Sequence, residues 1–179
     1  MAATTSTSLF DASLISPEVA SSFPDGYQVR PLERGDYAKG FFECLQVLTS
    51  TGDISSQQFD ERFDWMSTQG KGTYFFLVIE AEGRIVGTGA LIVERKFIHN
   101  LGTVGHIEEI SIQKDQQGKK LGLKMIHAID SVAANTGCYK TILNCGERNE
   151  GFYLKCGYRK QALEMAKYFE AEKNGYERG

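Results

Sequence analysis

The chain has 179 residues, 41% of them apolar and three of them proline, which is enough for one core and favours a single domain. Its net charge of −3 and the lack of lysine or arginine runs longer than a pair exclude the basic surface typical of nucleic-acid-binding proteins. No stretch approaches the roughly 20 apolar residues of a membrane span, and the N-terminus has no signal-peptide pattern. We expect a soluble, cytoplasmic protein without membrane or nucleic-acid partners.

The cysteines and histidines give no sign of a metal site. The four cysteines (Cys44, Cys138, Cys145 and Cys156) are irregularly spaced without a C-x-x-C pair, and there are three histidines. This matches neither a zinc site nor a disulfide scaffold, so we expect reduced thiols and no metal.

The N-terminal third is predicted to hold a leader, a strand and two helices. Residues 1–26 are rich in Ser, Thr and Ala without sustained periodicity and predict a flexible leader. Alternation over 27–32 predicts a strand, and apolar residues at helical spacing over 37–48 predict a helix. Ser55 followed by Gln58 is a capping-box pattern that predicts the start of a second helix.

The rest of the chain alternates strands with helices. Residues 73–80 and 85–94 predict a β-hairpin around the turn AEGR, and 106–112 predict another strand. An amphipathic helix follows, and then a strand over 138–145, which implies parallel pairing with 106–112.

The chain ends in a predicted short helix over 149–155 and a segment, 158–170, in which strand and helix patterns are equally good. The order of elements predicts one mixed sheet covered by helices, in the α/β (α+β) class.

The loop before the amphipathic helix has the composition of an anion site. Gly118 and Gly122 flank Lys119 and Lys120, where unpaired helix N–H groups and the helix dipole favour negative charge. An ordinary junction with solvated lysines is the alternative. The spacing matches neither G-x-x-x-x-G-K-[ST] nor G-x-G-x-x-G, which disfavours ATP and dinucleotides.

Several segments carry a family resemblance. The strand ending in ISI, the loop QQGKKLG and the helix after it resemble the acetyl-coenzyme A motif of the GNAT acetyltransferases, Q/R-x-x-G-x-G/A, with Lys120 in place of the middle glycine. PDGYQVRPLERGDY, LTSTG, ERKFIHNLGTVGHIEEISI, GCYKTILNC and NEGFYLKCGY together resemble the eukaryotic, particularly fungal, glucosamine 6-phosphate N-acetyltransferases over residues 24–170.

The resemblance implies a single GNAT-type domain over 27–170, with a mixed central β-sheet flanked by helices, and a polar tail over 171–179. It also implies direct acetyl transfer, in a ternary complex, from acetyl-CoA to the 2-amino group of D-glucosamine 6-phosphate, a step toward UDP-N-acetylglucosamine. Family members form homodimers in which the last strand crosses to the partner, and the segment 158–170 is compatible with such an exchange.

The resemblance assigns coenzyme contacts to a strand backbone, the glycine-containing loop and the short helix near the C-terminus. These residues are Ile110, Ser111, Ile112, Gln117, Gly118, Lys119, Lys120, Leu121, Gly122, Asn149, Tyr153 and Lys155.

Two adjacent carboxylates, Glu108 and Glu109, are the first catalytic candidates. Strand alternation predicts that they point to opposite faces, Glu108 with Ile110 and Glu109 with Ser111. By residue type alone both are solvated strand-end charges. The resemblance implies that Glu108 positions the amine or accepts its proton, directly or through water. Glu109 stands where the family usually has aspartate.

Tyr153 is the second catalytic candidate. Taken alone, Asn149 reads as a helix cap and Tyr153 as a half-buried core aromatic. The resemblance implies that Asn149 contacts coenzyme A and that Tyr153 is the general acid for the leaving thiolate. Cys156 has no histidine beside it and is interpreted as a core residue.

The acceptor is expected to meet a cationic loop. Lys96 and His99 could bind a phosphate monoester, although such residues taken alone are more often a solvated charge and a turn histidine. The resemblance implies acceptor contacts from Thr49, Lys96, Phe97, Ile98, His99, Glu108, Glu109, Tyr139, Lys140 and Asn144.

Asn144 departs from the family, which usually has an aspartate there, near the acceptor amine. Loss of that charge weakens attraction for an ammonium group. Two alternatives stay open. Glu109 and Asn144 together leave room for an acetyltransferase that uses another amine, and the same two departures with Lys120 leave room for a non-catalytic acetyl-CoA-binding dimer.

Overall fold

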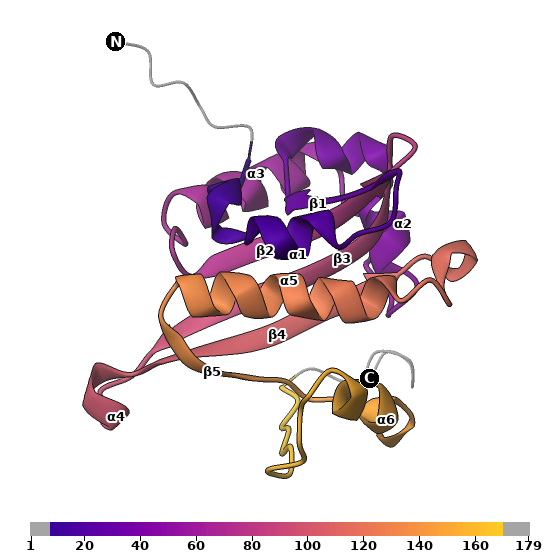
Figure 1. Ribbon diagram of the computed structural model, residues 1–179. Coiled ribbons are helices and arrows are strands. Elements are labelled where there is room, and N and C mark those ends of the chain that lie inside the picture. Colours follow the sequence, from indigo (N-terminus) through magenta and orange to yellow (C-terminus); the bar gives the residue numbers. More distant parts are fainter. Residues whose placement is uncertain (1–7, 170–179) are drawn as a thin grey trace.

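The computed structural model describes residues 8–169, which form a five-stranded β-sheet with helices on both faces (Figure 1). The strands are β1 (Tyr27–Pro31), β2 (Tyr74–Ala81), β3 (Arg84–Arg95), β4 (Thr103–Ile112) and β5 (Cys138–Ile142). The helices are α1 (Pro17–Ser21), α2 (Phe41–Leu45), α3 (Ser56–Ser67), α4 (Ile98–Leu101), α5 (Leu121–Asn135) and α6 (Glu147–Lys155). Short 3-10 turns cover η1 (Ala12–Leu14), η2 (Arg34–Lys39) and η3 (Lys114–Gln116).

The strands lie in the sheet in chain order. β1 to β4 pair antiparallel, and β5 joins β4 in parallel after the crossover through α5. The predicted mixed sheet, the hairpin of β2 and β3 and the parallel last pair are confirmed. None of the helices within residues 8–169 has the length and apolar character needed to cross a membrane.

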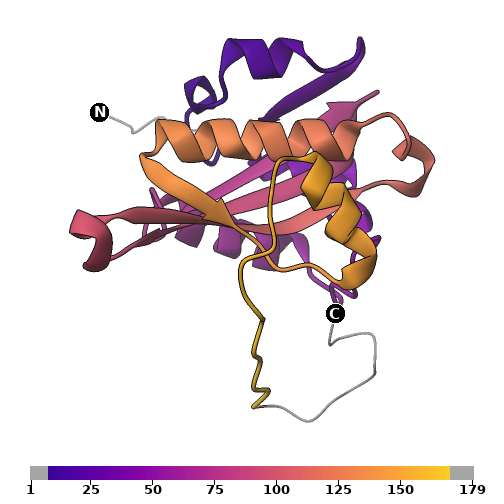
Figure 2. The ribbon, with the colours of Figure 1, turned by 60° about the horizontal axis from the view of Figure 1, so that its bottom comes forward.

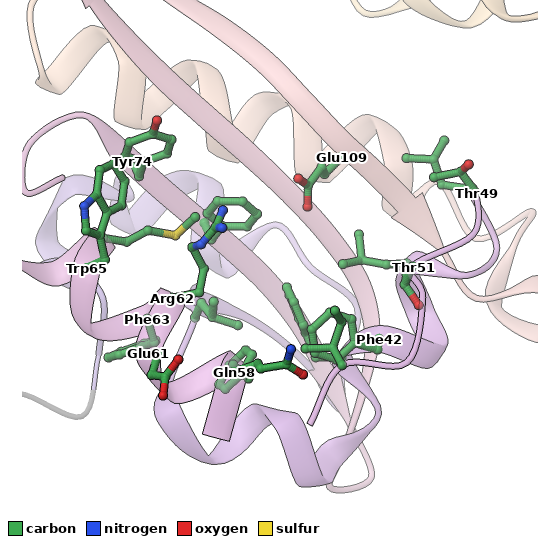
Figure 3. Close-up of a pocket in the computed structure, with 18 of the residues that line it drawn as sticks. Phe42, Thr49, Thr51, Gln58, Glu61, Arg62, Phe63, Trp65, Tyr74 and Glu109 are labelled. Carbon is green, nitrogen blue, oxygen red and sulfur yellow. The ribbon is translucent and has the colours of Figure 1, made fainter. Parts of the chain in front are cut away.

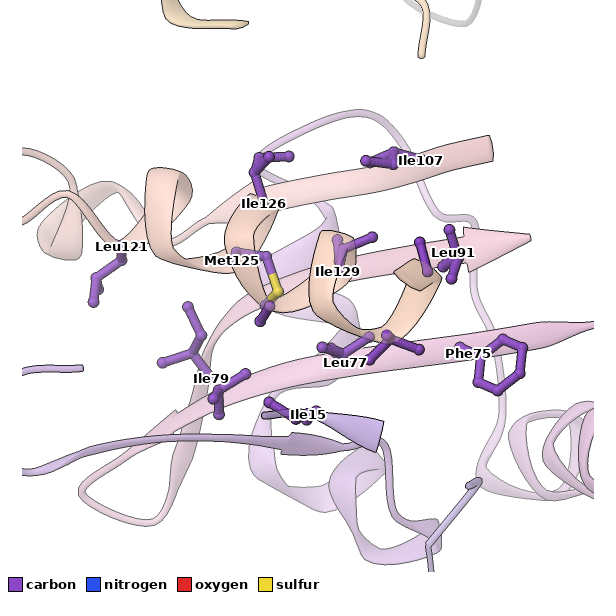
Figure 4. Packing of buried hydrophobic residues seen from close by; sticks show 14 of the residues in the cluster. Ile15, Phe75, Leu77, Ile79, Leu91, Ile107, Leu121, Met125, Ile126 and Ile129 are labelled. Carbon is purple, nitrogen blue, oxygen red and sulfur yellow. The ribbon is translucent and has the colours of Figure 1, made fainter. Parts of the chain in front are cut away.

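A core lies on each face of the sheet. In β2, Leu77 packs under α5 while its neighbour Phe76 packs under α2 and α3, because successive strand residues point to opposite faces. Figure 4 shows Met125 and Ile129 of α5 against Leu77 and Leu91 of the sheet. Each large buried side chain of this kind stabilises the fold by about 1.5–3 kcal/mol, so the two cores hold the sheet between its helices.

Residues 8–26 differ from the expected flexible leader, because they pack against α5 (Figures 1 and 2). Ile15 and Phe23 are buried in the core under α5, and the N–H of Ser16 donates to the Ser131 hydroxyl at 2.9 Å. Because η1 and α1 are each very short, the apolar residues of this segment are irregularly spaced, and the sequence shows no helical or strand periodicity. The predictions for residues 1–7 and for the polar tail lie outside the described residues.

Other boundaries also differ from the predictions. The helix predicted over 37–48 is split at Gly40, whose φ of +86° ends η2 and precedes α2. The capping box is confirmed, since the Gln58 N–H donates to the Ser55 hydroxyl and the Ser55 N–H to the Gln58 side chain. β5 ends at Ile142, and residues 158–169 form neither strand nor helix.

Candidate active site

Among residues 8–169, the second half of β4 has no neighbouring strand on the side of β5. Within the described chain, β5 pairs with β4 only as far as His106, opposite Ile142. Residues 107–112 continue as a strand, but their backbone groups on this edge have no strand partner. Unpaired N–H and C=O groups seek a ligand or water. The predicted contact of the coenzyme arm with Ile110 to Ile112 is consistent with these unpaired groups and stays a prediction.

One extra residue in β4 interrupts its pairing with β3. Thr88 lies opposite Ser111, whereas Ala90 lies opposite Glu108, so one residue of β3 faces two of β4. Glu109 takes a left-handed backbone conformation at this bulge, with φ of +55°. A bulge of this kind bends the strand and turns its side chains.

The bulge overturns the strict alternation predicted for the strand. Ile107 and Ile110 both pack in the core under α5, although a regular strand would place them on opposite faces. Glu108 is level with Ala90, which belongs to the core beneath α2 and α3, and Glu109 lines a pocket on that same side. The prediction that the two carboxylates point to opposite faces is therefore wrong.

Burial raises the pKa of both carboxyl groups. For Glu109 the charge of Glu108 raises the pKa further, while Arg62 lowers it. For Glu108, His106 lowers the pKa and Glu164 raises it. Glu109 lines the pocket and is exposed to solvent there. A carboxylate with a raised pKa is a stronger general base.

A pocket of about 890 Å³ lies between α2, α3 and the bulge of β4 (Figure 3). Thr49 and Glu109, two of the predicted acceptor contacts, both line it. Arg62 and Trp65 of α3 form part of the wall and were not predicted to be site residues. Its volume is in the range of sites that bind small molecules, and its lining is mostly apolar with a few polar groups such as Thr49, Arg62 and Glu109.

Arg62 and Trp65 could have been suspected from their spacing. They lie three residues apart on a helix whose start the capping box had located, which puts them on neighbouring parts of one surface. The side of α3 that faces the pocket is set by how α3 packs on the sheet, and the sequence of α3 alone does not predict that packing.

A second hollow, of about 950 Å³, lies between the end of β5, α6 and the segment after it. Tyr153, Lys140 and Asn144 line it. Burial raises the pKa of Tyr153 to about 12, and the charges of two cysteines and Glu108 act in the same direction. A phenol with this pKa stays protonated at neutral pH and can donate to a leaving thiolate. Glu108 and Tyr153 are thus within electrostatic reach of each other.

The glycine-containing loop leads directly into α5. Gly118 and Lys120 have φ of +83° and +62°, and Lys120 is the N-cap without a side-chain hydrogen bond to the helix. No described side chain caps the first N–H groups of this 15-residue helix, which is consistent with an anion site there. The pyrophosphate site itself stays a prediction. Leu121 is buried and anchors the helix start.

Other residues of this loop have structural partners. The Lys119 ammonium donates to the Tyr27 hydroxyl and to Gln116, each at 2.7 Å, and the Gln117 side chain donates to the Ile112 carbonyl. A Cβ on Gly122 would lie 3.3 Å from the Phe152 ring. Gly122 thus allows α6 to approach α5.

The predicted coenzyme contacts on α6 lie inside the helix. Gly146 is the N-cap, so Asn149 belongs to the first turn and the interpretation as a cap is wrong. Lys155 lies in the last turn, and both side chains are exposed. α6 thereby carries Asn149, Tyr153 and Lys155 along one short helix.

The predicted phosphate-binding loop lies at the tip of the β3–β4 hairpin, far along the strand from the carboxylates (Figure 1). Lys96 pairs with Glu94 at 2.6 Å, and the His99 ring lies 5.3 Å from the Tyr139 ring. Phe97 is 95% exposed and Ile98 63% exposed. The structure therefore groups the tip with Tyr139 and separates it from Glu108 and Glu109.

Comparison with known proteins identifies the family. The model of the acetyltransferase (GNAT) family matches residues 39–158. A glucosamine 6-phosphate N-acetyltransferase from Candida albicans is 44% identical over 142 residues, which cover 79% of this chain and 95% of the relative. One from Arabidopsis thaliana is 39% identical and covers 80% of this chain and 97% of the relative.

The chain belongs to the glucosamine 6-phosphate N-acetyltransferases of the GNAT family. The crystal structure of the Arabidopsis thaliana enzyme agrees with this acetyltransferase fold, with a TM-score of 0.77 and 38% identity over 80% of this chain and 99% of that one. The family resemblance and the GNAT-type fold expected from the sequence are confirmed.

Proposed function

We propose that this acetyltransferase moves the acetyl group of acetyl-CoA to the 2-amino group of D-glucosamine 6-phosphate, giving N-acetyl-D-glucosamine 6-phosphate and CoA. The observation that carries the proposal is the bulge at Glu109. It directs Glu108 and Glu109, whose pKa values are both raised, toward the side of the sheet that holds the pocket. Within the described part of the chain, the edge of β4 next to them has no strand partner. The names of the relatives supply the acceptor. The product would serve UDP-N-acetylglucosamine synthesis.

Acetyl-CoA is the proposed cosubstrate. Its pyrophosphate would lie on the N–H groups at the start of α5, and its pantetheine arm along the open edge of β4. Lys120 holds the left-handed conformation that a glycine adopts more easily, so its backbone can still face a ligand.

In the proposed direct transfer, Glu108 accepts a proton from the acceptor ammonium, directly or through water, and the free amine attacks the thioester carbonyl. The carbon–sulfur bond then breaks. Tyr153 donates a hydrogen bond, and finally its proton, to the leaving sulfur. Cys156 takes no part, because burial raises the pKa of its thiol and so disfavours the thiolate.

The acceptor site is proposed to span a homodimer. Glu108 and Thr103 are five residues apart on one strand, roughly 16 Å, and the hairpin tip lies beyond Thr103. One sugar phosphate cannot bridge that length, so the tip of a second copy is the proposed source of its phosphate contacts. Leu163 and Met165, 84% and 91% exposed, lie in the segment proposed to cross to the partner.

The cytoplasm is the proposed location, since the four free cysteines suit a reducing compartment. Transfer to another amine is the second candidate. The uncharged Asn144 beside Tyr153 in the second hollow is the observation that favours it.

Mass-spectrometric detection of acetylated product tests the proposal. The purified chain is incubated with acetyl-CoA and, separately, with glucosamine 6-phosphate, glucosamine and a panel of small amines. Acetylation of the phosphorylated sugar supports the proposal. Acetylation of a different amine alone would favour the second candidate, and coenzyme binding without any product would favour a non-catalytic role.

A further inference from the structure

The sequence Gly87-Thr88-Gly89 runs through the middle of β3, directly opposite the bulge. A Cβ on Gly89 would lie 2.7 Å from the Ile129 side chain and 2.8 Å from that of Ile110. A Cβ on Gly87 would meet Ile79 at 2.8 Å. Both glycines therefore face α5, and their missing side chains let the bulged strand and the helix close over β3.

Thr88 points to the opposite face, toward α2. Its side chain is fully buried, and its hydroxyl donates to the Glu109 carbonyl at 2.9 Å. A bulge leaves one residue out of the ladder of backbone hydrogen bonds. The Glu109 carbonyl is partly shielded from water, and the buried Thr88 hydroxyl gives it a partner in place of the ladder bond that the bulge interrupts.

The Glu109 backbone needs such support. A non-glycine residue at φ of +55° is strained and persists only where its surroundings hold it. The hydrogen bond from Thr88 reaches the very peptide that follows this strained residue. Its neighbour Ser111 is also fixed, because the Ser111 hydroxyl donates to the Cys44 carbonyl at 2.6 Å.

We propose that Thr88 is a positioning residue for the acetyl transfer. Its hydroxyl holds the Glu109 peptide in the bulged conformation and thereby sets the direction of both carboxylates, Glu108 and Glu109, without touching either substrate. This inference rests on the proposed function, because it concerns the geometry of that same reaction. A displacement of about 1 Å at a reacting group is enough to slow turnover about 100-fold.

Thr88→Val tests the inference, because valine keeps the shape and loses the donor. We expect kcat to fall about 10- to 100-fold, while KM for acetyl-CoA changes less than about twofold. Thr88→Ser restores the hydroxyl and should return kcat to within about threefold of wild type. Thr136→Val is the matched control, since the Thr136 hydroxyl donates to the Val132 and Ala133 carbonyls at the C-terminal end of α5 and contacts the Cys138 sulfur, away from the bulge. It should change thermal stability but not kcat.

An unchanged kcat in Thr88→Val would overturn the inference, as would a Thr88→Ser variant as impaired as Thr88→Val. If Thr88→Val does not fold, Thr88→Ala removes the same donor without adding a methyl group, and it carries the same expectation and the same contradiction. Failure of the proposed function is distinguishable, because the wild-type chain itself would then not acetylate glucosamine 6-phosphate.

Discussion

Arg30 donates two parallel hydrogen bonds to Asp36, from Nη1 to Oδ2 at 2.8 Å and from Nη2 to Oδ1 at 2.6 Å. Asp36 is fully buried and Arg30 nearly so. Burial opposes the charge on Arg30, but its bonds to Asp36 and Glu80 outweigh that effect and raise its pKa. The pair fixes η2 to β1 and so determines where α2 and the pocket begin.

Asp36→Ala should destabilise the fold by about 3–5 kcal/mol, because it leaves a buried guanidinium without its main partner. Asp60→Ala breaks an exposed pair with Arg34 and should cost less than about 1 kcal/mol. Urea unfolding of both variants measures the difference. Equal effects would mean that the Arg30 pair contributes no more than a surface contact.

Tyr153→Phe should lower kcat about 100-fold and leave KM for acetyl-CoA nearly unchanged, because the lost hydroxyl acts on the leaving sulfur in the transition state. Steady-state kinetics with both substrates gives the two parameters. Tyr158→Phe is the matched control, since the Tyr158 hydroxyl is bound by Thr141 and Asp130. Full activity in Tyr153→Phe would remove the phenol from the mechanism.

The acidic limb of the pH profile should lie above the usual range for a glutamate. Burial raises the pKa of Glu108, and the group works as a base only when deprotonated, so kcat/KM should rise with pH as the carboxyl loses its proton. The Glu108→Gln variant should lose this limb together with most of its activity. A wild-type limb at the ordinary carboxyl pKa would argue against Glu108 as the base.

Lys120→Gly should stabilise the fold by up to about 1 kcal/mol. The left-handed conformation costs a lysine about 1–2 kcal/mol, and the greater freedom of glycine in the unfolded chain offsets part of the gain. KM for acetyl-CoA should fall, because the ligand can approach the backbone more closely. Lys119→Gly is the control; Lys119 has no positive φ and donates to Tyr27, so its loss should destabilise. A destabilised Lys120→Gly would contradict the strain argument.

Asn144→Asp should raise kcat/KM for glucosamine 6-phosphate about fivefold, since a carboxylate near the acceptor contributes about 1 kcal/mol toward an ammonium group. Gln69→Glu makes the same change of charge at an exposed residue that lines neither pocket, and should have no effect. An unchanged rate in Asn144→Asp would show that another group already attracts the amine.

Local signals in the sequence were sufficient for some elements. The start of α3 followed from Ser55 and Gln58, and the β2–β3 hairpin from two alternating segments around a short turn, because the interactions that form them lie within a few residues. The family resemblance supplied the GNAT-type fold, which no single motif defined.

Features that depend on distant contacts were not predicted. The bulge at Glu109 relies on Thr88, 21 residues earlier, and on a close approach of α5 that Gly89 permits. The packing of Ile15 on α5 joins segments more than a hundred residues apart. A pattern of apolar residues within a short segment carries no information about contacts with distant segments. This is why the predicted alternation of β4 and the predicted flexible leader are wrong for the described residues.

The most direct measurement is the ratio of kcat/KM for glucosamine 6-phosphate to that for glucosamine, with acetyl-CoA saturating and product quantified by mass. A charged hydrogen bond to phosphate contributes about 1.5–3 kcal/mol, so we predict a ratio of at least about 10. A ratio near one, or no acetylation of either sugar by a chain that binds acetyl-CoA, would contradict the account.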